Sequence, residues 1–357
     1  MGVFRFDEIA KESRGTFKGN LEGKPIVGLE HIEPYDMLLK NWDVDVETTF
    51  TKEFHKGQIL FGRRRAYQHK ACVATCDGIC SGDITLIEPI EGMVYPDLLP
   101  FIVQNDDFFE HAIKGSNGAL SPRVKWEHMA NYEVNLPSLS EQKVLAEKLW
   151  AAYEVKQSYL KMIEATEKMV KSQFIEMFGN CSKVGLGQLA TFINGSAYKP
   201  EDWNEDGLPI VRIQNLNDAS SEYNYFNGDC SKKVIIDNGD VLVSWSATLG
   251  VFLWNKGKAL LNQHIFKVVF DKAEIDRDFF IYTVSVALDK MSEHTHGSTM
   301  KHIVKSEFDR FPVAYPSMDR QKEFARIVHQ ADKSISELRK SVDAIDKVIK
   351  SLINENL

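Results

Sequence analysis

The chain has 357 residues, 43% of them hydrophobic and 26% charged, which is typical of a soluble globular protein with two or three domains. No apolar run approaches the roughly 20 residues that a membrane-spanning helix needs, and the acidic, interrupted N-terminus is unlike a signal peptide, so we expect a cytoplasmic protein without membrane contact. Five cysteines argue against a disulfide framework. A net charge of -8, from 43 Lys and Arg against 51 Asp and Glu, disfavours indiscriminate polyanion binding but allows one concentrated basic face.

Residues 1–138 are predicted to form a globular α+β head, because short β-branched and aromatic runs alternate there with Gly, Asp and Asn turn signals. One stretch, FGRRRAYQHK, concentrates side chains that can bind DNA. Arginine and glutamine can pair with guanine and adenine edges and lysine suits phosphates, although a solvated charge run is the simpler alternative. The candidates in this stretch are Arg63, Arg64, Arg65, Gln68 and Lys70.

A second candidate stretch, SNGALSPRVKW, follows Gly115. It is basic and rich in hydroxyl and amide groups, which suits an element that faces a DNA groove. Its candidate contacts are Ser116, Asn117, Arg123 and Lys125.

Residues 139–179 are predicted to form a spacer helix, since residues 139–178 contain no Gly or Pro and are rich in Lys, Glu, Ala and Leu. A coiled-coil seam is only partly kept in this helix, and Lys156 interrupts it. The seam residues are Leu145, Leu149, Ile163 and Val170. The apolar stripe widens through Tyr153, Leu160, Phe174 and Met177, so we expect the helix to contact a head as well as a partner helix. Ser140 is the expected helix cap.

Residues 180–317 repeat the first head. GLPIVRIQNL aligns with GKPIVGLEHI, and NGDVL, HGSTM and YPSMDRQK follow in the same order as KGQIL, KGSNG and LPSLSEQK. These ordered landmarks indicate a tandem duplication and a second α+β head. The candidate DNA contacts of this head are Arg212, Gln214, Asn215, Ser298, Thr299, Lys301 and His302. The stretches RIQNLND, with Arg212, Gln214 and Asn215, and LLNQHIF, with Asn262, Gln263 and His264, are weaker candidates, because Asn and Gln serve equally well in turns and caps.

Residues 318–357 are predicted to form the second spacer helix, with Asp319 as its cap. Its apolar positions alternate in steps of four and three over about four heptads, which is the period of a coiled coil. The seam residues are Phe324, Val328, Ile335, Leu338, Val342, Ile345, Ile349 and Leu352. The alternative is an ordinary amphipathic helix on a globular core.

The order of the segments predicts an antiparallel helix pair, because the first helix ends where the second head begins and domain termini commonly lie close together. Each helix would span roughly 58 Å at about 1.5 Å per residue. The heads would then be related by an approximate two-fold axis, which suits two DNA half-sites at a fixed separation. Since the heads share landmarks but little else, we expect the half-sites to differ in sequence.

Motifs of catalysis and metal binding are absent from the sequence. We find no P-loop, no dinucleotide-binding glycine pattern, no nucleophile elbow, no His-Glu-x-x-His and no amino-methyltransferase Asn/Asp-Pro-Pro-aromatic tetrapeptide. Cys72, Cys76 and Cys80 have the spacing C-x3-C-x3-C, unlike the C-x2-C pairs of structural zinc sites. We therefore expect buried thiols rather than a metal site.

The chain resembles the specificity (S) subunits of Type I restriction-modification enzymes. The resemblance lies in the order of head, helix, head and helix, in LPSLSEQ and YPSMDRQ, which open the helices, and in GLPIVRIQNL and HGST of the second head. The resemblance covers essentially the whole chain. It implies two target recognition domains that each read one half of a bipartite double-stranded DNA target, separated by helices that set the gap. It also implies that this chain is not catalytic and binds no cofactor: two modification (M) subunits carry S-adenosylmethionine and methylate adenine N6, and restriction (R) subunits use ATP and Mg to translocate and cleave DNA.

Two other classes of protein stay open on the sequence alone. One is a coiled-coil scaffold whose heads bind protein or carbohydrate. The other is a stand-alone DNA-modifying enzyme whose site carries no recognisable motif.

Overall fold

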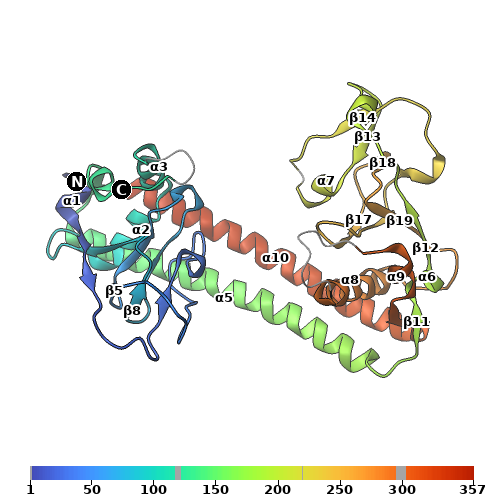
Figure 1. Cartoon of the computed structure of the whole chain (residues 1–357), viewed down its shortest axis with the longest axis horizontal. Coiled ribbons are helices and arrows are strands. Elements are labelled where there is room, and N and C mark those ends of the chain that lie inside the picture. Colours follow the sequence, from blue (N-terminus) through green and yellow to red (C-terminus); the bar gives the residue numbers. More distant parts are fainter. Residues whose placement is uncertain (1, 117–121, 219, 295–302) are drawn as a thin grey trace. The chain divides into compact units, whose positions relative to one another are not determined.

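A computed structural model of the chain describes residues 2–116, 122–218, 220–294 and 303–357, without the side chain of residue 294. The chain forms two compact units, unit 1 (Met1–Lys161 with Leu338–Leu357) and unit 2 (Met162–Glu337). Each unit contains a globular head and the adjoining parts of two long helices, α5 (Leu139–Phe178) and α10 (Met318–Asn356), drawn in green and red in Figure 1. We call residues 2–138 head 1 and residues 180–317 head 2.

Head 1 contains three small sheets, with strand orders β1-β10, β2-β9-β6-β7 and β3-β5-β8-β4. Its elements are β1 (Gly2–Arg5), α1 (Phe6–Ile9), β2 (Ala10–Ser13), β3 (Gly15–Thr16), β4 (Ile26–Val27), β5 (Lys52–Phe54), β6 (Ile59–Gly62), β7 (Ala71–Val73), β8 (Gly78–Cys80), β9 (Ile84–Pro89), α2 (Leu99–Val103), α3 (Asp106–Lys114), α4 (Trp126–Ala130) and β10 (Glu133–Leu136).

Head 2 also contains three sheets, with strand orders β11-β20, β12-β19-β16-β17 and β14-β13-β18-β15. Its elements are β11 (Lys183–Gly185), α6 (Leu186–Leu189), β12 (Thr191–Asn194), β13 (Leu208–Val211), α7 (Ile213–Asn217), β14 (Asn224–Phe226), β15 (Ile235–Ile236), β16 (Val241–Ser244), β17 (Gly250–Leu253), β18 (Ala259–Leu261), β19 (Ile265–Val269), α8 (Arg277–His294), α9 (Lys305–Arg310) and β20 (Pro312–Ala314).

The two heads repeat one topology. Each joins its first and last strands in an antiparallel pair, and the central four-stranded sheets have the same strand order. The third sheets share a parallel pair, β4 with β8 and β13 with β18, and differ in where the remaining edge strand attaches. The predicted α+β class and the internal duplication are confirmed.

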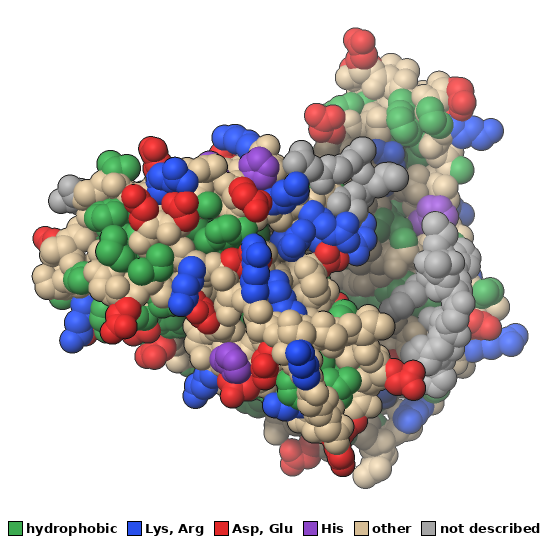
Figure 2. Space-filling view, turned by 60° about the vertical axis from the view of Figure 1, so that its left-hand side comes forward, with side chains coloured by type: hydrophobic (Ala, Val, Ile, Leu, Met, Phe, Trp, Pro, Cys, Tyr) green, Lys and Arg blue, Asp and Glu red, His purple; other side chains and the backbone are tan. Residues whose placement is uncertain are grey.

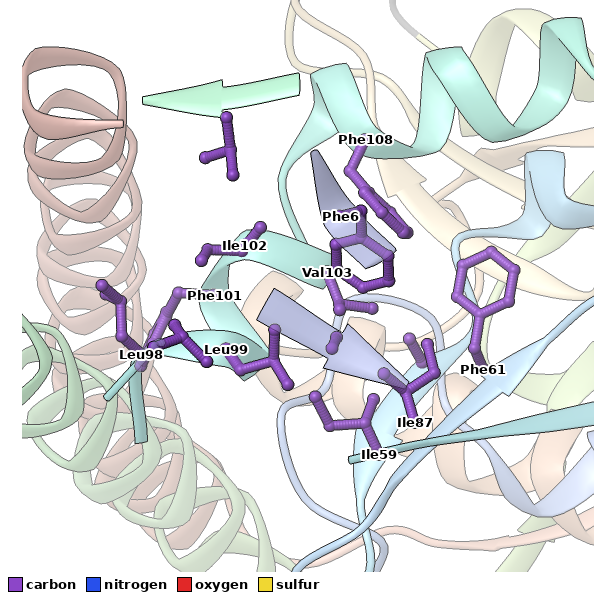
Figure 3. Close-up of a cluster of buried hydrophobic side chains, with 14 of the residues drawn as sticks. Phe6, Ile59, Phe61, Ile87, Leu98, Leu99, Phe101, Ile102, Val103 and Phe108 are labelled. Carbon is purple, nitrogen blue, oxygen red and sulfur yellow. The ribbon is translucent and has the colours of Figure 1, made fainter. Parts of the chain in front are cut away.

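Unit 1 is held together by one large apolar core (Figure 3). Phe6, Phe61 and Phe108 are fully buried in it, and the ring centroids of Phe6 and Phe108 lie 4.7 Å apart. The same core includes Leu149 of α5 and Ile353 of α10. Burial of these apolar surfaces fixes head 1 to both helices.

The helices are antiparallel within each unit. In unit 1, Lys156 Nζ of α5 lies 2.6 Å from Asp346 Oδ1 of α10, and earlier α5 residues share a core with later α10 residues. In unit 2, the Phe324 ring of α10 lies 5.3 Å from that of Phe174 and 5.5 Å from that of Phe178 in α5. Both arrangements agree with the predicted direction. Among the residues that the structure describes, no helix has the length and apolar character needed to cross a membrane.

The predicted seam residues lie in the buried or half-buried stripes of both helices. They are Leu145, Leu149, Ile163, Val170, Phe324, Val328, Ile335, Leu338, Val342, Ile345, Ile349 and Leu352. Lys156, which interrupts the pattern, is half-buried and reaches Asp346. The predicted widening of the apolar stripe of α5 is correct at Tyr153, which is buried and donates a hydrogen bond to Asp36 Oδ1 at 2.5 Å. It is wrong at Leu160, which is 40% exposed.

The repeated glutamine has the same structural role in both copies. Gln142 Oε1 accepts a hydrogen bond from Tyr95 N–H at 2.8 Å, and its Nε2 donates to Pro137 O at 2.9 Å. Gln321 Oε1 accepts from Asp276 N–H at 2.9 Å, and its Nε2 donates to the carbonyl of the repeated proline, Pro316, at 2.9 Å. Both side chains are buried, at 2% and 1% exposure. Each amide therefore fastens the start of a long helix to the backbone of the adjoining head.

The caps of the long helices differ from the prediction. Ser138 Oγ accepts from Glu141 N–H at 3.4 Å while Glu141 Oε2 accepts from Ser138 N–H at 2.9 Å, so Ser138 caps α5 and Ser140 lies inside it. Asp319 likewise lies within the first turn of α10 rather than before it. The error is one of position, because polar residues lie on both sides of each helix start.

Candidate nucleic-acid interface

The arginine-rich stretch of head 1 connects β6 to β7, and its backbone is tied to two distant segments. Arg63 N–H donates to Asp83 O at 2.9 Å, and Val124 N–H donates to Arg63 O at 2.8 Å. Arg65 N–H donates to Pro122 O at 2.9 Å. The structure therefore brings together the two candidate stretches of head 1, which lie about sixty residues apart in the sequence.

One carboxylate, Asp83, lies among these arginines. Arg123 Nε donates to Asp83 Oδ1 at 2.7 Å, and Arg64 Nη1 lies 3.5 Å from Asp83 Oδ2. The hydrogen bond from Arg123 holds the pKa of the Asp83 carboxyl below its ordinary value, burial opposes this effect, and the charges of the nearby arginines add to it. One carboxylate among three arginines leaves a net positive charge, which suits phosphates or guanine edges.

An open groove of about 730 Å³ lies in head 1. Its basic lining residues are Arg14, Lys52, Arg63 and Lys125, and it is also lined by Trp126, His128 and two glutamates. Arg63 Nε is buried without a hydrogen-bond partner among the described residues, so a ligand that offers an acceptor would stabilise it. Lys and Arg side chains, blue in Figure 2, gather near the middle of the face shown. We call the groove lined by Arg14, Lys52, Arg63 and Lys125 the basic groove.

The last residues of the arginine-rich stretch, His69 and Lys70, contact other parts of head 1. The ring of His69 lies 4.8 Å from that of Tyr35 and 4.5 Å from that of Phe109. Lys70 Nζ donates to Leu29 O at 2.6 Å. Lys70 therefore makes a backbone contact within the head, and its contact with a DNA phosphate stays a prediction.

The other predicted residues of head 1 have varied surroundings. Ser116 Oγ donates to Ile113 O at 2.7 Å, and Asn117 lies outside the described residues. Arg123 and Lys125 are exposed, and Gln68 is half-buried. Only Arg123 and Lys125 of this group combine charge with access to solvent.

The cysteines of head 1 lie in or beside its interior. Cys72 and Cys80 belong to a buried apolar cluster, and Cys76 packs against it. Burial raises the pKa of the Cys80 thiol to about 12 and also raises that of Cys72. Within the described ranges, no group of three or more His, Cys, Asp or Glu side chains is arranged to hold a metal ion.

In head 2 the predicted contacts Arg212, Gln214 and Asn215 lie at the start of α7. The guanidinium carbon of Arg212 lies 5.1 Å from the ring centroid of Trp203, and Gln214 is exposed. Asn215 is buried, and its amide donates to two carbonyls of the following loop at 3.3 and 3.0 Å. Asn215 therefore holds the loop together, and its contact with DNA stays a prediction. The remaining predicted residues, Ser298, Thr299, Lys301 and His302, lie outside the part of the chain that the structure describes.

Three polar residues of head 1 escaped the sequence analysis: Arg14, Lys52 and Asp83. Arg14 follows β2 and Lys52 opens β5, so both reach the basic groove through strand pairing rather than through a local motif. Lys52 Nζ also donates to Ile84 O at 2.7 Å, and burial lowers the pKa of this lysine. No sequence signal marks these residues, because sheet registry alone brings them near the arginines.

Two heads of one topology, with different polar side chains on each, define a duplicated recognition protein. Residues 180–345 match the family model described as Type I restriction modification DNA specificity domain. The chain is 22% identical over 334 residues to the putative type I restriction enzyme MjaX specificity subunit of Methanocaldococcus jannaschii. The aligned region covers 84% of this chain and 77% of that protein.

Two solved structures share the fold. A chain solved in work on complex assembly and conformational transition of the type I R-M system superposes with a TM-score of 0.58 at 16% identity, covering 99% of this chain and 97% of that one. The Type-I S subunit from M. genitalium superposes with a TM-score of 0.54 at 12% identity, covering 99% and 94%. The family model and the M. jannaschii protein show what the chain is similar to in sequence, and the two solved structures show the fold that it shares.

Proposed function

We propose that the chain is the DNA sequence-recognition subunit of a Type I restriction-modification enzyme. Residues 1–138 and 180–317 are the two target recognition domains, and residues 139–179 and 318–357 are the spacer helices. Each head reads one half of an asymmetric, bipartite DNA target. The observation that carries this proposal is the repetition of one topology with different polar surfaces in the two copies.

The chemistry of the complex belongs to its partners. Two adenine-N6 methyltransferase subunits dock on the equivalent helix surfaces and bind S-adenosylmethionine, and restriction subunits bind ATP and Mg. The net charge of -8 fits this division, because the partner subunits can supply much of the surface that neutralises DNA phosphates. The complex acts on double-stranded DNA in the cytoplasm.

Shortening the helices is expected to shorten the gap between the half-sites. Deleting seven residues from each helix at facing positions removes roughly 10.5 Å of helix, or at most about 3 base pairs of B-DNA. Sequencing of methylated adenines should show the same bases in each half-site and a smaller gap. A control in which one heptad of each helix is replaced by another sequence with the same seam should keep the gap, and an unchanged gap in the deletion variant would refute the spacer role.

Removing charge from the basic groove is expected to weaken DNA binding by the complex. Arg14→Ala with Lys125→Ala should lower the dependence of log K on log salt by up to about 2, since each lost phosphate contact lowers it by about 1. Salt titrations of binding to a target duplex measure this slope. Lys56→Ala with Lys114→Ala makes the same charge change on residues that do not line the groove, and equal effects of both pairs would argue against a specific interface.

A further inference from the structure

Two residue pairs occupy equivalent positions in the heads, because they make the same backbone hydrogen bond. In head 1, Arg63 N–H donates to Asp83 O at 2.9 Å; in head 2, Trp245 N–H donates to His264 O at 3.4 Å. In each head, the carbonyl of the first of these residues accepts a further N–H from the segment before α4 or α9. Trp245 and His264 therefore occupy the positions that Arg63 and Asp83 occupy in head 1.

A second shared bond places two polar side chains beside this pair. Asn262 N–H donates to Val211 O at 3.1 Å where β18 and β13 end, as β8 and β4 are joined in head 1. The next residues along these strands are Gln263 and Arg212. Both equivalent positions in head 1 are glycine, so these side chains belong to head 2 alone.

Arg212, Gln263 and His264 hold buried polar atoms that find no partner in the described ranges. These atoms are Arg212 Nε, Gln263 Oε1 and His264 Nδ1, and the Gln263 Nε2 to His264 Nε2 separation of 3.4 Å is long for a hydrogen bond. Buried polar groups are almost always paired, so these atoms leave hydrogen-bonding capacity that a bound ligand would satisfy. We call these three residues the amide corner.

Aromatic side chains hold the amide corner in place. The Arg212 guanidinium lies 5.1 Å from the Trp203 ring, and the His264 ring lies 5.6 Å from the Trp245 ring. Side chains fixed in this way lose little freedom when they bind a planar partner. The corner is therefore suited to reading a base edge.

We propose that the amide corner reads bases in the half-site of head 2 and that Gln263 selects adenine. A glutamine amide offers one acceptor and one donor to N6 and N7 of adenine, and Gln263 Oε1 lacks a partner within the head. Arg212 supplies further donors from the end of the neighbouring strand β13. Head 1 has Arg63 in its own groove, and arginine pairs with guanine. This inference rests on the proposed function and names the residues that distinguish the two heads.

The test uses the chain assembled with its methyltransferase partner, S-adenosylmethionine and a duplex library randomised in both half-sites. In Gln263→Ala, preference for adenine at one position of one half-site should fall about 5- to 150-fold, with the other half-site unchanged. The matched variant Arg63→Ala should relax one position in the opposite half-site. Gln263→Glu should move the preference from adenine toward cytosine, since a carboxylate accepts from cytosine N4, and a misfolded head cannot produce a new preference.

The outcomes separate this inference from the function on which it rests. A wild-type complex that methylates no split target refutes the proposed function. A wild-type complex with a split target, combined with Gln263→Ala and Gln263→Glu complexes of unaltered preference, refutes the assignment of Gln263 and leaves the function standing. Loss of preference in both half-sites with Gln263→Ala would also overturn the assignment.

Discussion

Phe324→Ala is expected to lower the free energy of unfolding of unit 2 by about 3–5 kcal/mol, which is typical of a large buried aromatic replaced by alanine. Phe324 is fully buried, and its ring meets those of Phe174, Phe178, Phe279 and Tyr282 at centroid distances of 5.3, 5.5, 6.3 and 5.0 Å. These rings come from α5, α8 and α10. The cavity would therefore weaken the contact between both long helices and head 2.

Hydrogen exchange is the suitable measurement, because two compact units need not unfold in one step. Peptides from α8 and from the part of α5 in unit 2 should lose protection, while those of head 1 should keep it. Val348→Ala is the control on α10, since Val348 is 52% exposed and its loss should change stability by no more than about 0.5 kcal/mol. Equal protection in Phe324→Ala and in the wild-type chain would contradict the packing described for unit 2.

Gln321→Leu is expected to destabilise unit 2, and Gln142→Leu unit 1, through one mechanism. Each substitution leaves one backbone N–H and one proline carbonyl without its glutamine partner in a buried or half-buried position. The cost is at most about 1–3 kcal/mol for each group and is partly offset by the apolar leucine. Because the two glutamines lie in separate units, the losses in the double variant should add. Urea titrations followed by tryptophan fluorescence measure them, with three tryptophans in each unit.

The lysines of the repeated signature provide the matched control. Lys143 and Lys322 follow the two glutamines directly and are exposed. Their replacement by alanine should change stability by no more than about 0.5 kcal/mol. If the lysine variants proved as unstable as the glutamine variants, the helix surface rather than the buried amide would explain the repeat.

The long helices and the duplication could be predicted because their signals are local or recurrent. A four-three apolar period defines α10 without knowledge of its partner, and ordered landmarks such as the two proline-to-glutamine signatures define the repeat. The signature itself predicts a junction between head and helix. The sequence could not show that Gln142 and Gln321 form that junction, since their partners, Tyr95 and Asp276, lie 47 and 45 residues away.

The candidate interface was predictable only in part, because sheet registry rather than spacing assembles it. The triple arginine stands out by composition, whereas Asp83 and Lys52 look like any other surface charge. Asn215 shows the limit of composition: amides suit DNA edges and loop backbones equally, and the sequence does not show that this amide is buried against a loop. The amide corner depends on the parallel pairing of β13 with β18, which no local pattern predicts.

The most direct test of a two-headed recognition subunit is the sequencing of N6-methylated adenines in cells that contain the methyltransferase partner with and without this chain. We predict one asymmetric target, split by a fixed gap, that is methylated only when the chain is present. Methylation of the same sites without the chain, or methylation of one uninterrupted sequence, would contradict the account.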